Sequence, residues 1–102
     1  MTDHDLPDIS FLTSGEVSDA DRDAARAAVR SALDGGADDV TSVRVTLSVV
    51  PDADLPCPAL AQAIVGVDGA RLRAQAAGRT LPEAIDLLRD RLHVRTAYLR
   101  AG

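Results

Sequence analysis

Residues 59–77 read ALAQAIVGVDGARLRAQAA, two segments in which alanine, valine or leucine recurs at every second position, separated by Asp68-Gly69. A period of two is typical of a β-strand with one buried face, and Asp-Gly between two such segments is a strong signal for a tight hairpin turn. In the second segment the predicted inward residues are Leu72, Ala74 and Ala76, and the outward ones are Arg71, Arg73 and Gln75. We therefore expect a β-hairpin with one solvated face.

A third strand is predicted just upstream, where residues 41–50 read TSVRVTLSVV. Valine and leucine alternate there with serine, threonine and Arg44, so one face is apolar and the other polar. The connecting segment 51–58 carries three prolines and two aspartates. Proline cannot donate to a sheet ladder, so this segment is predicted to be an acidic loop and not a central strand.

A first helix is predicted between a short β-like segment, residues 9–13, and the strand at 41–50. Ser18 followed by Asp21 has the spacing of a capping box, in which each side chain accepts a hydrogen bond from the other residue's backbone N–H. Alanine and valine recur at helical spacing up to about Leu33, and Gly35-Gly36 supplies a stop signal.

A second helix is predicted after the hairpin, from the same kind of start signal. Thr80 and Glu83 have capping-box spacing, and Pro82 is tolerated in the first turn, where its missing N–H costs nothing. One stripe of the helix is apolar and holds Leu81, Ile85, Leu88, Leu92 and Leu99.

Together these elements predict an α+β fold in the order β-α-β-β-β-α. A helical crossover implies that the first two strands are parallel, whereas the later connections imply antiparallel pairs, so the four-stranded sheet should be mixed. Each helix has one apolar side and each strand has one apolar face. The simplest packing places both helices on one face of the sheet and leaves the other face solvated.

Length and composition restrict the class of protein. The chain has 102 residues, enough for one domain, which we assign to residues 8–102 after a disordered arm at 1–7. The single Cys57 excludes an internal disulfide and a cysteine-built zinc site, and no cofactor or metal is expected. No membrane-spanning run, signal peptide or enzyme signature is present, so we expect a cytoplasmic, non-enzymatic protein.

Charge is distributed unevenly along the chain. All eleven basic residues are arginine, and the formal net charge is −5. Residues 1–70 hold four arginines against thirteen acids, net −9, whereas residues 71–102 hold seven against three, net +4. Such an acidic chain is not expected to bind nucleic acid indiscriminately. A basic C-terminal third on an acidic body is suited to an oriented contact with RNA, and it is equally typical of a solvated helix face.

Possible ion pairs distinguish the arginines from one another, because an acid three or four residues earlier on a helix can neutralise an arginine. Such acids precede Arg22 (Asp19), Arg26 (Asp23) and Arg89 (Asp86). Arg91 and Arg95 have none and lie four residues apart on one side of the second helix. They are therefore predicted to be free to bind, with Arg71, Arg73 and Arg44 forming a second patch on the exposed sheet face.

Several stretches resemble the N-terminal domain of the ribosome hibernation-promoting-factor family, also called the sigma-54-modulation or ribosome-associated-inhibitor family. EAIDLLRDRL, residues 83–92, is similar to the family signature A-A-I-D-L-L-x-D-K-L, with Arg91 at the lysine position. The other similar stretches are residues 43–49, 61–69 and 72–76. Residues 58–62 and 73–78 look more like the actinobacterial, dormancy-associated branch. The resemblance covers about residues 9–95.

This resemblance implies a stress-induced protein that binds ribosomal RNA on the small ribosomal subunit and inhibits translation. Arg22 matches a family arginine at the start of the first helix, so the RNA-binding candidates implied are Arg91, Arg95, Arg71, Arg73, Arg44 and Arg22. Long family members carry a C-terminal domain that pairs ribosomes. The chain ends at Gly102 without it, and pairing by that route is not expected.

An alternative is a protein-interaction module that keeps the fold but no longer binds the ribosome. Family members present basic residues after the second strand, where this chain has Val50-Pro51-Asp52-Ala53-Asp54, and the tail after Leu92 is only thinly basic. Ile64 is predicted to be exposed on the open face of the sheet, through which the chain would form a homodimer.

Overall fold

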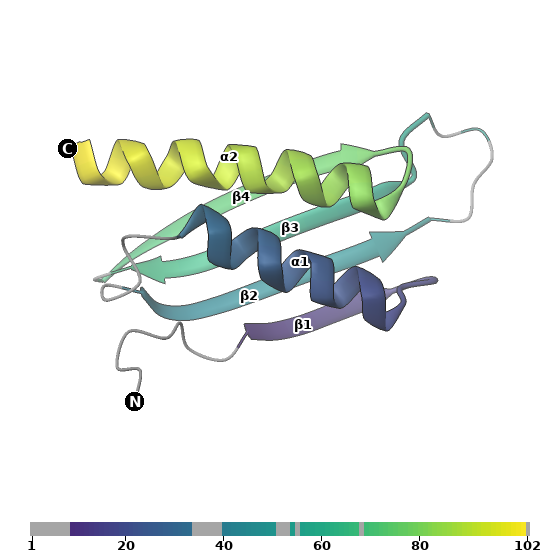
Figure 1. Ribbon diagram of the computed structural model, residues 1–102, viewed down its shortest axis with the longest axis horizontal. Helices are drawn as coiled ribbons and strands as arrows, with labels where there is room; N and C mark the ends of the chain where they lie inside the picture. The colour runs from purple at the N-terminus through teal and green to yellow at the C-terminus, as the bar shows by residue number, and fades with distance from the viewer. Residues whose placement is uncertain (1–8, 34–39, 51–53, 55, 68, 102) are drawn as a thin grey trace.

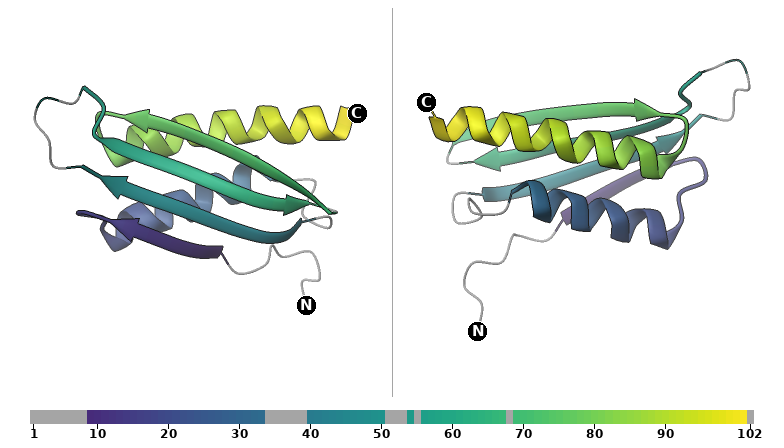
Figure 2. Two further views of the ribbon diagram at one scale, coloured as in Figure 1. Left: turned by 180° about the vertical axis from the view of Figure 1, so that it is seen from behind. Right: turned by 45° about the horizontal axis from the view of Figure 1, so that its top comes forward.

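The computed structural model describes residues 9–33, 40–50, 54, 56–67 and 69–101. Its elements are β1 (Ile9–Ser14), α1 (Asp19–Ala32), β2 (Val40–Val49), β3 (Ala59–Val67), β4 (Ala70–Gly78) and α2 (Leu81–Ala101). The strands form one sheet and both helices cover the same face of it (Figures 1 and 2). The predicted order and one-sided packing are confirmed. The predicted arm, the Gly35-Gly36 stop and Asp52 lie outside the described residues.

The sheet is mixed, as predicted, with strand order β1-β2-β3-β4. β1 runs parallel to β2, with Ile9 opposite Val43, because the chain crosses over through α1. The pairs β2–β3 and β3–β4 are antiparallel. Val67 pairs with Ala70, so the β3–β4 turn is tight, and Gly69 adopts a φ of +81° there. β1 and β4 are consequently the two edge strands.

The core lies between the sheet and the two helices and is built from small aliphatic side chains. Alternate residues are buried in β2 from Val43 to Leu47 and throughout β3, as the period of two predicts, whereas Val40 is buried out of phase because the register shifts between Val40 and Ser42. Leu88 and Leu92 of α2 are fully buried against them. Thr96 continues the buried stripe, and its hydroxyl is satisfied by donating to the His93 carbonyl at 2.8 Å. The sheet and the other helix, α1, therefore hold α2 along its buried stripe.

Both helix starts use the predicted residues, but only the first forms the complete capping box. Ser18 Oγ accepts from Asp21 N–H at 3.1 Å, and Asp21 Oδ2 accepts from Ser18 N–H at 3.1 Å. At α2, Thr80 Oγ1 accepts from Glu83 N–H at 3.3 Å, whereas Glu83 accepts from Arg79 N–H at 2.9 Å. The longer glutamate side chain reaches one residue further back than the predicted box requires.

A glycine connects β1 to α1. Gly15 has a φ of +82°, in the region that side chains of L-residues rarely adopt. A Cβ at this position would collide with the carbonyl oxygen of Val49, at the end of β2. The close approach holds the start of the crossover against the neighbouring strand.

The sheet face opposite the helices carries the polar sides of the strands (Figure 2). Ser10, Arg44, Ile64 and Arg73 are paired in one row across the four strands. Ile64 is half-buried, so the prediction that it is exposed is wrong. Its row neighbours are the long side chains of Arg44 and Arg73, whose stems can cover apolar surface.

Candidate nucleic-acid interface

Four of the six predicted arginines line one groove along the edge of the sheet. Arg71 and Arg73 come from β4, and Arg91 and Arg95 come from α2. The groove encloses about 940 Å³ and is also lined by Ala74, Gln75, Asp90, Val94 and Tyr98. We call this set of nine residues the basic groove. The fold therefore brings together two pairs of arginines that are about twenty residues apart in sequence.

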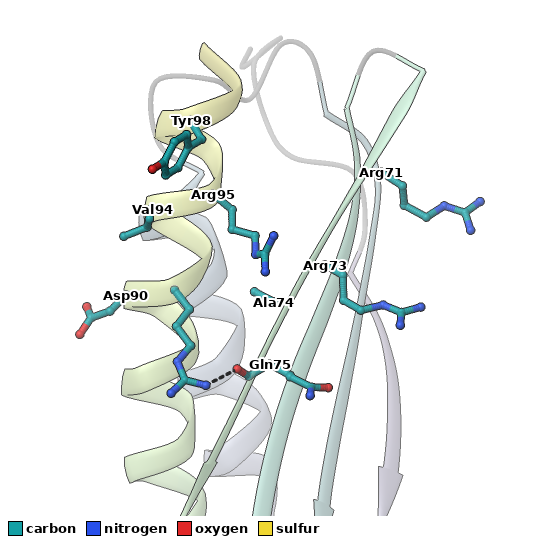
Figure 3. Close-up of a pocket in the computed structure, with 9 residues that line it drawn as sticks. Arg71, Arg73, Ala74, Gln75, Asp90, Val94, Arg95 and Tyr98 are labelled. Atoms are coloured by element: carbon teal, nitrogen blue, oxygen red, sulfur yellow. Dashed lines mark hydrogen bonds between the residues drawn. The ribbon is translucent and has the colours of Figure 1, made fainter. Parts of the chain in front are cut away.

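The arginine side chains lie on two sides of the β4 edge (Figure 3). Arg95 reaches from α2 toward the strand, whereas Arg71 and Arg73 extend on the other side of β4, away from α2. Asp90, the one acid of the groove, points away from the strand. A polyanion lying along this edge can therefore contact arginines on both sides without passing the carboxylate.

Arg91 is not free, contrary to the prediction. Its guanidinium donates a hydrogen bond of 2.7 Å to the backbone carbonyl of Gln75 (Figure 3). β4 is an edge strand, so this carbonyl has no neighbouring strand to donate to it. The contact positions the guanidinium at the strand edge and leaves its remaining N–H groups to bind a ligand, since the side chain is exposed.

Arg44 extends the positive surface onto the open face of the sheet. A second hollow, of about 220 Å³, lies between β1, β2, β3 and β4 and is lined by Ser10, Ser42, Val43, Arg44, Ile64 and Arg71. Arg71 lines both hollows, so the basic groove continues into the predicted sheet-face patch. Neither β2, β3 nor β4 contains an aspartate or glutamate in its described residues. The face is basic although the whole chain is acidic.

Arg22 lies apart from this surface. It is on α1, where it forms the predicted ion pair with Asp19. Arg26 forms the predicted pair with Asp23 at 2.8 Å, and its guanidinium also lies 5.3 Å from the centre of the Phe11 ring. Arg22 and Arg26 are thus both paired within α1, and the structure does not bring Arg22 to the groove.

The predicted pairing of Arg89 is wrong. Arg89 contacts the adjacent Asp90 at 3.4 Å and not Asp86. All three side chains are exposed, and exposed ion pairs contribute little free energy, so the choice of partner is weakly determined.

Sequence reasoning did not assign the other five lining residues to the site: Ala74, Gln75, Asp90, Val94 and Tyr98. Helical spacing could have found two of them, because Val94 is three residues from Arg91 and Tyr98 is three from Arg95. The part played by the Gln75 carbonyl depends on how far α2 overhangs β4, for which the sequence gives no signal. In the part of the chain that the structure describes, no cluster of residues could hold a metal ion, and no helix is both long and apolar enough to cross a bilayer.

No family model and no curated protein matches this chain. Solved structures that share its fold include the following two. One is a ribosomal subunit interface protein from Coxiella burnetii, at 18% identity and a TM-score of 0.77, over 92% of this chain and 98% of that one. The other is the N-terminal domain of Protein Y from Thermus thermophilus, at 25% identity and a TM-score of 0.69, over 87% and 94%.

These likenesses support the resemblance predicted from the sequence at the level of the fold. Both cover most of this chain and nearly all of the other protein. Proteins with the fold of this chain therefore include one described as a ribosomal subunit interface protein.

Proposed function

We propose that this protein is a ribosome-associated translation inhibitor that binds RNA of the small ribosomal subunit through the basic groove. One observation carries the proposal: Arg71, Arg73, Arg91 and Arg95 lie on the two sides of one sheet edge in a chain whose net charge is −5. Arginine offers planar, forked donors that match phosphate geometry. The protein would act in the cytoplasm by occupying a site, without a chemical step.

The form of the groove supports a polymeric ligand. It lies open along the C-terminal half of α2 and the length of β4 from Arg71 to Gln75. Small molecules usually bind in concave sites that bury most of their surface, whereas a nucleic-acid strand follows an extended positive groove. The hollow next to Arg44 and Arg71 lengthens the path by continuing it across the open sheet face.

The acidic body gives this contact an orientation. Residues 1–70 carry a net charge of −9 and residues 71–102 carry +4. Phosphate is repelled by most of the surface and attracted at the β4 edge, so encounters that place this edge on RNA are favoured. We place the protein in the dormancy-associated branch of the hibernation-factor family on the motifs at 58–62 and 73–78, with stress induction as the corresponding role.

A protein-interaction module of the same fold is the second candidate, and one observation favours it. Leu12 of β1 is 63% exposed on the open sheet face, in the row that continues through Thr46 and Gln62. Half-buried Leu60 and Ile64 share that face. A second copy or another protein packed there would bury these side chains, and the resulting association would strengthen with salt, whereas RNA binding weakens.

Co-sedimentation with purified small ribosomal subunits tests the proposal. The variant Arg91→Glu/Arg95→Glu should lose binding and no longer inhibit a cell-free translation reaction, because it reverses two charges in the groove. A matched control, Arg30→Glu/Arg79→Glu, changes the net charge equally at exposed positions outside the groove and should bind as the parent does. Circular dichroism checks that each variant is folded.

Equal loss of binding in both variants would show that only overall charge matters. Unchanged binding in the groove variant would remove the groove from the account. If the parent protein instead forms a dimer that salt strengthens and Leu12→Asp abolishes, the protein-interaction function is the correct one.

A further inference from the structure

An exposed aromatic side chain lies at the end of the basic groove. Tyr98 is 78% exposed and Val94, one helical turn earlier, is 54% exposed. The chain has only one other aromatic residue, Phe11, which is half-buried and covered by Arg26. Phe11 is thus packed against the core, whereas Tyr98 is exposed to solvent beside four arginines.

Tyr98 belongs to one continuous patch with the groove arginines. Residues three or four apart are neighbours on a helix surface, which links Arg91 to Val94 and Arg95, and Arg95 to Tyr98. Arg95 faces the β4 edge, whereas Val94 and Tyr98 lie on the side of α2 away from the strand (Figure 3). The positively charged side chains on the sheet side of α2 are therefore flanked by a parallel row formed by Val94 and Tyr98.

We propose that Tyr98 is a stacking platform for an unpaired base of an RNA strand whose phosphates are held by Arg91 and Arg95. This inference rests on the proposed function, and it specifies that the ligand is single-stranded. Bases in an A-form duplex are stacked on one another and cannot reach a side-chain ring, whereas unpaired bases are free to stack on aromatic residues. Val94 would support the sugar or the edge of the same base.

The arrangement favours a nucleic acid over an acidic protein segment. Four arginines complement either ligand, but a flat, exposed ring at the rim complements a flat base. An aspartate- or glutamate-rich segment presents no such plane.

Tyr98 reports on its own environment. The chain has one tyrosine and no tryptophan, so the tyrosine emission of the full-length protein comes from this residue alone. Stacking on a base should quench it. Inorganic polyphosphate, which carries charge without bases, should bind the arginines and leave the emission unchanged.

The test titrates the protein with single-stranded oligouridylate and, separately, with inorganic polyphosphate. Tyr98→Ala should weaken RNA binding about five- to 150-fold, the range for loss of one aromatic–base stack. Its polyphosphate affinity should not change, and Tyr98→Phe should bind RNA like the parent. The control Leu87→Ala removes another exposed apolar side chain of α2, outside the groove, and should have no effect on either ligand.

Each outcome has a distinct meaning. RNA binding that requires Arg91 and Arg95 but neither quenches Tyr98 nor weakens in Tyr98→Ala would overturn this inference and leave the proposed function intact. Weaker polyphosphate binding by Tyr98→Ala would also overturn it, because the ring would then act by shaping the groove. Polyglutamate that quenches Tyr98 more strongly than RNA would assign the platform to a protein partner. Failure to bind RNA or ribosomal subunits at all would refute the proposed function, and this inference with it.

Discussion

Replacing Arg71 and Arg73 by glutamine removes two of the four positive charges of the basic groove while keeping side chains that can form hydrogen bonds. Each phosphate neutralised on a single strand contributes about −0.7 to the slope of log K against log salt. If each groove arginine neutralises one phosphate, the parent slope is about −2.8 and the double variant's is about −1.4. Raising salt fourfold should then weaken RNA binding about 50-fold for the parent and about sevenfold for the variant.

Fluorescence anisotropy of an end-labelled single-stranded RNA measures these affinities across a salt series. The control Arg30→Gln/Arg79→Gln removes the same number of charges from exposed positions outside the groove and should keep the parent slope. A slope that stays near −2.8 after the loss of Arg71 and Arg73 would refute the assignment of these residues to phosphate contacts. A parent slope near zero would refute an electrostatic groove altogether.

Two further predictions concern the fold that positions the groove. Leu88→Ala should lower the free energy of unfolding by about 2–5 kcal/mol in urea unfolding, because Leu88 is fully buried. The control Leu87→Ala, at a position 38% exposed, should change this free energy by no more than about 0.5 kcal/mol. Gly15→Ala should cost at least about 1–2 kcal/mol, since alanine resists a positive φ and its Cβ would strike the Val49 carbonyl; an unchanged thermal midpoint would contradict that reading.

The sheet was predictable because its signals are local and consistent with one another. Alternation in residues 41–50 and 59–77 follows the pleat, so the buried residues of β3, and those of β2 from Val43 to Leu47, are the ones that the period of two assigns to the inner face. Ser18 and Asp21 fix the start of α1 through hydrogen bonds three residues apart. Such contacts depend on spacing along the chain and not on tertiary geometry.

The candidate site was only partly predictable because it depends on how elements distant in sequence are placed. The groove needs α2 to overhang the β4 edge, where Arg91 reaches a carbonyl sixteen residues away in sequence. Pattern reasoning found Arg91 and Arg95 on one side of the helix, and it found Arg71 and Arg73 on the outer face of the strand. It could not show that the four line one groove, nor that Arg91 would already donate a hydrogen bond to a backbone carbonyl.

Exposed side chains limited the prediction in a second way. Arg89 has acids at both Asp86 and Asp90, and the free-energy difference between such solvated pairs is small. Ile64 is half-buried although it lies on the open face, where its row neighbours are the long side chains of Arg44 and Arg73. Side-chain rotamers on a solvated surface leave no periodic signal in the sequence.

The most direct measurement of the central claim is a titration of the purified, unmodified protein onto separated small and large ribosomal subunits, followed by pelleting at low and at high salt. The account predicts saturable binding to the small subunit at an equal molar ratio, lost as salt rises, and no comparable binding to the large subunit. Absence of binding to the small subunit at low salt, or equal binding to both subunits, would contradict it.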